Sequence, residues 1–75
     1  MIYHIEENDL YVDLKNVFAV TDIYIPMPSA PVDNGVRQFC INVAGHMHVV
    51  RCNSLVETTK VRMNLINAWK KAKSK

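Results

Sequence analysis

The feature that most constrains this fold is a helix-forming segment at the C-terminal end of the chain. Residues 55–73 contain neither glycine nor proline, the two residues that most disfavour a helix interior. Ser54 and Glu57 fit a capping box, in which the serine accepts a backbone N–H of the first turn and the glutamate reaches back to the backbone N–H of the cap. We therefore expect a helix over about residues 54–73, packed against the structure that residues 2–52 form.

The predicted helix has one clear apolar face. At about 100° per residue, one arc of roughly 100° contains Thr58, Val61, Leu65, Ala68, Trp69 and Ala72. Val56 and Met63 project on nearly the opposite side of the helix. Together with Ile66 they are candidates for a seam that binds a partner or a second copy. The alternative is that they are scattered apolar surface residues, which are common in proteins.

Before the helix, apolar and polar residues alternate with the period of two that marks half-buried strands. Residues 2–6 and 10–14 predict a hairpin, residues 17–25 predict a third strand, and residues 39–52 predict a second hairpin. The expected fold class is α+β, a single domain over residues 1–75 in which an antiparallel sheet of about five strands packs on one C-terminal helix. The expected core is Tyr3, Ile5, Leu10, Val12, Val17, Val20, Phe39, Ile41, Val43, Val50, Leu65 and Trp69.

The register of the second hairpin depends on the length of its loop. A two-residue loop of Gly45 and His46 suits a type II′ turn, because glycine readily takes a positive φ at the first central position. This register sets Phe39 opposite Cys52 and places Cys40 and Cys52 on opposite faces of the sheet. A three-residue loop that includes Met47 would instead set Cys40 directly opposite Cys52. We favour the two-residue loop.

A proline-rich segment over residues 26–35 interrupts the predicted sheet, which spans about residues 2–52. Its three prolines lack the N–H that a central strand or a helix would need, so it is expected to be a loop. One interpretation is a plain connection. The other is a binding loop that exposes Met27 and Val32, since compact domains often place recognition on loops.

Charge is divided between the two parts of the chain. Residues 1–36 hold six acidic residues against one basic residue, a net charge of −5, and residues 37–75 hold eight basic residues against one acidic residue, a net charge of +7. A small body with one acidic and one basic side favours association steered by charge. The partner could be a protein or a second copy, and we expect a homodimer to be the form that self-association takes.

Four potential metal ligands, Cys40, His46, His48 and Cys52, lie close together in the sequence. Zinc would need such side chains to converge, but the predicted hairpin sends the two thiols to different faces. A cysteine–histidine pair would also need an oxyanion-binding loop and an orienting group, and neither can be assigned. The sequence therefore predicts two thiols that pack as small hydrophobic groups, no metal site, no cofactor and no catalytic residues.

The basic C-terminal region offers an alternative function, nucleic-acid binding. The candidate residues for phosphate contacts are Arg62, Lys70, Lys71, Lys73 and Lys75. Aromatic residues are not interleaved with them, as stacking on single strands would favour. Lysines in the last turn also complement the negative end of the helix dipole, which gives some of them a structural role.

The sequence also bears on location. No apolar run approaches the ~20 residues of a membrane-spanning helix, and the first residues lack the basic start and apolar core of a signal peptide. We expect a cytoplasmic protein with reduced thiols and no membrane partner.

The run from Val12 to Val17, followed by Phe39, Gly45, Val50 and then Ser54-Leu55, resembles the strand, hairpin and capped-helix pattern of the DNA-binding domain of LytTR response regulators. This chain lacks the basic strand that follows the helix in that family, so its DNA contacts are not carried over.

In architecture the whole chain resembles short phage-encoded accessory proteins, which have a small antiparallel sheet and a terminal helix. Many of these proteins bind and block a host protein. The resemblance implies a binding protein without enzymatic activity that acts as an inhibitor or adaptor.

Overall fold

The computed structural model describes residues 2–26 and 34–74. Its elements, in chain order, are β1 (Ile2–Ile5), the 3-10 turn η1 (Glu6–Asn8), β2 (Leu10–Asp13), the 3-10 turn η2 (Leu14–Asn16), β3 (Val17–Val20), β4 (Arg37–Val43), β5 (His46–Cys52) and α1 (Leu55–Lys73). This arrangement confirms the α+β class, with five strands and one C-terminal helix. The loop candidates Met27 and Val32 lie outside the described residues. The described part of the chain contains no helix with both the length and the apolar character needed to cross a membrane.

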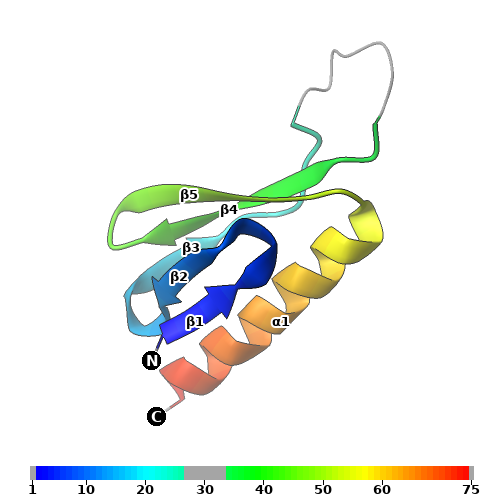
Figure 1. The fold of residues 1–75 in the computed structure, drawn as a ribbon. Coiled ribbons are helices and arrows are strands. Elements are labelled where there is room, and N and C mark those ends of the chain that lie inside the picture. Colours follow the sequence, from blue (N-terminus) through cyan, green and yellow to red (C-terminus); the bar gives the residue numbers. More distant parts are fainter. Residues whose placement is uncertain (1, 27–33, 75) are drawn as a thin grey trace.

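The five strands form two antiparallel sheets rather than one. β1 and β2 make a two-stranded sheet, and the other three strands pair in the order β3-β4-β5. The β1–β2 hairpin and α1 lie on the same side of the three-stranded sheet (Figure 1). The hairpin joins β3 through η2, while η1, at its other end, contacts β5. One face of the three-stranded sheet is therefore covered, and we call the opposite face the outer sheet face.

The helix begins where the capping residues predict. The Ser54 hydroxyl oxygen accepts a hydrogen bond from the Glu57 backbone N–H at 3.1 Å, and the chain at Ser54 is extended. The face of α1 that packs on the sheet contains Thr58, Val61, Leu65 and Ala72, and Ala68 and Trp69 pack beside them. The predicted apolar face of the helix is confirmed.

The core lies between α1, the hairpin and the inner face of the three-stranded sheet. Its side chains under 2% exposed include Phe39, Ile41 and Val50 from the sheet and Leu65 from the helix. All twelve predicted core residues are either buried in this cluster or packed against it. Leu14, which is fully buried in η2, was not among the predicted core residues, although it continues the alternation of Leu10 and Val12.

The predicted register of the β4–β5 hairpin is wrong by two residues. Val43 pairs with His46, and Phe39 pairs with Val50, so the loop consists of Ala44 and Gly45. Both loop residues have positive φ, 53° and 90°, as a type I′ turn requires. Because the shift is two residues, each side chain keeps its predicted face, and Cys40 and Cys52 do lie on opposite faces.

Contacts outside the loop stabilise this turn. The Gly45 N–H donates to Asn42 Oδ1 at 2.9 Å, and the Ala44 N–H donates to the Asn16 carbonyl oxygen at 2.8 Å. An alanine at φ 53° is unfavourable on its own. The turn therefore depends on partners in β4 and η2 that local sequence patterns do not reveal.

The third strand is shorter than predicted. It ends at Val20, has a register irregularity between Val17 and Ala19, and is followed by one isolated bridge between Tyr24 and Gln38. At Thr21 the backbone N–H still donates to the Cys40 carbonyl oxygen at 2.9 Å, but the Cys40 N–H donates to the Thr21 side-chain oxygen at 2.8 Å. A side chain thus takes the place of a backbone partner.

Candidate binding surfaces

The outer sheet face has no covering element among the described residues. The rows of paired residues that point to it are Tyr24–Gln38–Arg51, Cys40–Val49 and Ala19–Asn42–Met47. Large apolar side chains are exposed here: Met47 is 55% exposed, Val49 48% and Tyr24 41%. Most of the apolar surface lies toward the β4–β5 turn. The outer sheet face is therefore suited to contact with another protein.

Polar side chains form a connected row at the other end of the outer sheet face. Arg51 Nε donates to Gln38 Oε1 at 3.0 Å, and Gln38 Nε2 donates to the Tyr24 hydroxyl at 2.8 Å. The same hydroxyl lies 3.2 Å from Cys40 Sγ, and this contact raises the pKa of Tyr24. The row holds the aromatic ring of Tyr24 over the buried Gln38 and fixes its position beside the apolar residues.

The helix stripe predicted as a seam is also exposed. Val56 is 80% exposed and Met63 is 52% exposed, while Ile66 is half-buried. Because Val56 and Met63 lie away from the packed face of α1, they are available to a partner. Among the described residues, the hydrogen-bonded row of side chains found on the outer sheet face has no counterpart around this stripe.

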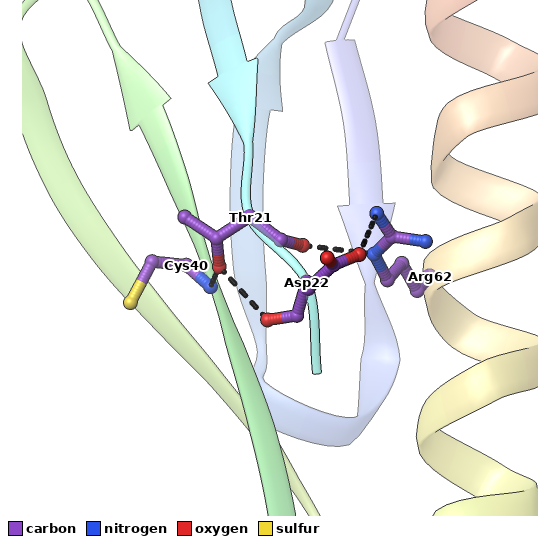
Figure 2. A network of polar contacts seen from close by, with 4 residues as sticks. All are labelled: Thr21, Asp22, Cys40 and Arg62. Atoms are coloured by element: carbon purple, nitrogen blue, oxygen red, sulfur yellow. Dashed lines mark hydrogen bonds and ion pairs between the residues drawn. The ribbon is translucent and has the colours of Figure 1, made fainter. Parts of the chain in front are cut away.

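Arg62, a nucleic-acid candidate, is engaged within the chain. Its Nε donates to the Thr21 carbonyl oxygen at 2.8 Å, and its Nη2 lies 3.3 Å from Asp22 Oδ1. Figure 2 shows this guanidinium reaching from α1 to the segment after β3, where Thr21 in turn bonds to Cys40 of β4. Arg62 therefore joins the helix to the edge of the sheet.

The remaining nucleic-acid candidates are near the end of α1. Lys70, Lys71 and Lys73 are exposed in its last turn, beside the negative end of the helix dipole. Lys75 lies outside the described residues. With Arg62 occupied, the phosphate-binding set is reduced to one short cluster of lysines.

An open groove of about 410 Å³ lies between β1, η1 and the N-terminal half of α1. Its lining includes the carboxylates of Glu6, Glu7 and Glu57, with Lys60 beside them. Burial raises the pKa of the Tyr3 hydroxyl at this groove, and the charge of Glu7 raises it further. Three carboxylates thus lie beside the N-terminal half of α1, whereas three lysines lie in its last turn.

The two thiols occupy different environments. Cys52 is 3% exposed and faces the core, whereas Cys40 is half-buried on the outer sheet face. Burial raises the pKa of the Cys52 thiol; a hydrogen bond with Thr58 opposes this rise, and the charges of Glu57 and Glu7 add to it. Across residues 2–26 and 34–74, no three histidine, cysteine or acidic side chains cluster as metal ligands would.

These environments predict a difference in thiol reactivity. In a Cys52→Ser variant, the remaining Cys40 should react with a disulfide reagent at least about tenfold faster than Cys52 does in a Cys40→Ser variant, because a buried thiol with a raised pKa forms little accessible thiolate. The absorbance of the thiolate that the reagent releases measures both rates. In denaturant the two rates should converge, and equal rates under native conditions would contradict the burial of Cys52.

Sequence patterns did not single out the outer sheet face. The alternation in β5 places Met47 and Val49 on one face and His48 and Val50 on the other, but both faces carry apolar residues. Which of the two faces is covered depends on where the β1–β2 hairpin and α1 pack. The exposed apolar residue Tyr24 lies beyond the last regular strand pairing, so periodicity gave it no face.

Comparison with protein-family models, curated proteins and solved structures finds no match to this chain.

Proposed function

We propose that this chain is a small binding protein without catalytic activity, which acts as an inhibitor or adaptor by contacting another protein through the outer sheet face. The observation that carries this proposal is the uncovered face itself, where Tyr24, Met47 and Val49 stand exposed on a sheet whose other side faces the core. Strand β5 holds Met47 and Val49 in place, and the hydrogen bond from Gln38 holds Tyr24, so little conformational entropy is lost when they bind.

The rest of the surface supports the same role. Arg51 and Asn42 border the apolar residues and provide the polar rim that protein interfaces usually have. The acidic groove and the lysine cluster lie at opposite ends of α1, an arrangement that steers an approaching charged protein. The chain resembles phage-encoded accessory proteins, many of which inhibit a host protein by binding to it. Inhibition of this kind needs only such a surface.

Two methionines on opposite surfaces provide a matched test. A tagged chain is used to capture proteins from nuclease-treated lysate of the source cells at low and high salt, and the partner identified by mass spectrometry is purified for affinity measurements. Met47→Asp, on the outer sheet face, should weaken binding of this purified partner at least about tenfold, because a carboxylate would be buried in the contact. Met63→Asp on the helix stripe is equally exposed and should leave binding unchanged.

A reversal of this pattern, with Met63→Asp disruptive and Met47→Asp neutral, would assign binding to the helix stripe and contradict the proposal.

Nucleic-acid binding makes a different prediction. It requires retention of the chain on DNA or RNA at 50 mM salt, a steep loss of binding as salt increases, and loss of retention when Lys70, Lys71 and Lys73 are changed to glutamine. We expect no retention, since Arg62 is bonded within the chain and the described candidates left for phosphate contacts are three lysines in one short cluster. Salt-dependent retention that the lysine substitutions abolish would replace the proposed function.

A further inference from the structure

β5 is an edge strand of the three-stranded sheet, because its one partner in the sheet is β4. In an antiparallel pair, the N–H and C=O groups of alternate residues point toward the partner strand or away from it. The structure fixes this alternation at Arg51, whose N–H donates to Asn8 Oδ1 at 3.1 Å and whose carbonyl oxygen accepts from Asn8 Nδ2 at 3.0 Å. The backbone of Arg51 therefore points away from β4.

Met47 and Val49 share the alternation of Arg51, so their backbone groups also point away from β4. Among the described residues, no backbone hydrogen bond occupies this side of either residue. The Asn8 amide thus substitutes for a pairing strand at one end of β5 and leaves the rest of the edge open. The open edge, which we define as residues 46–50, can accept an extended strand.

The open edge lacks the protection that edge strands usually carry. Exposed edges are commonly blocked by lysine, proline or a bulge, and residues 46–50 contain neither lysine nor proline and pair with β4 without a break in register. The side chains beside the open backbone, Met47 and Val49, are apolar and about half exposed. Such an edge favours pairing with another strand over solvation.

We infer that the open edge pairs with the same edge of a second copy, so that β5 strands from two chains join antiparallel about a two-fold axis through His48. This inference rests on the proposed binding role and names one partner for it. In this register Met47 of each copy lies opposite Val49 of the other, which gives four main-chain hydrogen bonds and two apolar cross-strand pairs.

Two features of the chain favour a second copy as the occupant. The register is self-complementary, since the same apolar pair repeats on both sides of the axis, as closed two-fold dimers require. It also ends at the Asn8 amide of each copy, where the acidic residues Glu6, Glu7 and Asp9 lie next to the edge. The partner's His46 would lie beside this acidic turn, and no lysine or arginine of the two edges would lie directly opposite another.

The inference predicts a dimer whose association depends on the Val49 N–H. Analytical ultracentrifugation over a range of concentrations should show a reversible monomer–dimer equilibrium for the native chain. Val49→Pro removes two of the four main-chain hydrogen bonds and should weaken dimerisation at least about fivefold, at a net ~0.5–1.5 kcal/mol per bond. Proline is tolerated on the solvent side of an edge strand, so the fold should survive.

Three controls test whether the edge, rather than another surface, forms the dimer. Val49→Thr keeps the N–H and should retain the dimer, while Val49→Lys adds an edge charge and should weaken it even if the proline variant fails to fold. Val56→Lys makes the same change on the helix stripe and should have no effect. In native protein, amide exchange at Met47 and Val49 should slow as concentration rises.

The results separate this inference from the proposed function. A chain that stays monomeric at all concentrations, or a dimer lost in Val56→Lys but not in Val49→Lys, overturns the edge-paired dimer. If the chain is monomeric but binds another protein, and Met47→Asp weakens that binding, the proposed function stands without the dimer. A dimer with slowed exchange at Met47 and Val49 supports the inference even if no other protein is captured.

Discussion

Leu65→Ala should remove a large share of the stability of this domain. Leu65 is fully buried in α1, in one cluster with Phe39 and Ile41 of β4. Truncation of a buried leucine costs about 2–5 kcal/mol, because the lost transfer free energy adds to the cost of the cavity. A domain of 75 residues has a total unfolding free energy of only about 4–11 kcal/mol, so the variant should be partly unfolded at 37 °C.

A matched control lies two residues away on the same helix. Met63→Ala removes a side chain of similar size that is about half exposed, and it should change the unfolding free energy by less than about 1 kcal/mol. Urea unfolding followed by circular dichroism at one fixed protein concentration compares the two. Equal losses of stability would mean that α1 does not pack on the sheet through its Thr58–Leu65 face.

The elements that the sequence predicted correctly are those whose signals are local. The helix of residues 55–73 has its own cap at Ser54, an uninterrupted run without glycine or proline, and a single apolar face. Alternation likewise placed Phe39 and Cys40 on opposite faces of the sheet. This prediction of facing is correct although the predicted register is wrong by two residues, because side-chain direction repeats every two residues. Secondary structure and facing could therefore be predicted from the sequence.

The errors occur where a partner distant in the sequence decides the structure. Ala44 adopts a positive φ because Asn16 and Asn42 bond to its turn, and β3 ends where Thr21 bonds to Cys40 with its side chain. Neither effect leaves a periodic pattern. The same limit applies to the binding surfaces. Helical periodicity predicted the exposed helix stripe, but no local pattern shows which face of the three-stranded sheet the β1–β2 hairpin and α1 cover.

Arg62→Met should show that this residue is structural. Its Nε bond to the Thr21 carbonyl oxygen is charge-assisted and half-buried, with the arginine side chain 24% exposed. Loss of such a bond costs about 1.5–3 kcal/mol, and methionine retains much of the side chain's packing. Thermal and urea unfolding of Arg62→Met should therefore reveal a clear loss of stability.

Two comparisons show which contact of Arg62 stabilises the fold. Asp22 is fully exposed, so its ion pair with Arg62 contributes little, and Asp22→Asn should leave the stability nearly unchanged. Lys71→Met removes an exposed cation from the same helix and should be similarly mild. If Arg62→Met were no more destabilising than Lys71→Met, the guanidinium would be free for an external ligand such as phosphate. The expected result instead assigns Arg62 to the junction between α1 and the edge of the sheet, a junction that holds the sheet in the orientation in which its outer face is exposed.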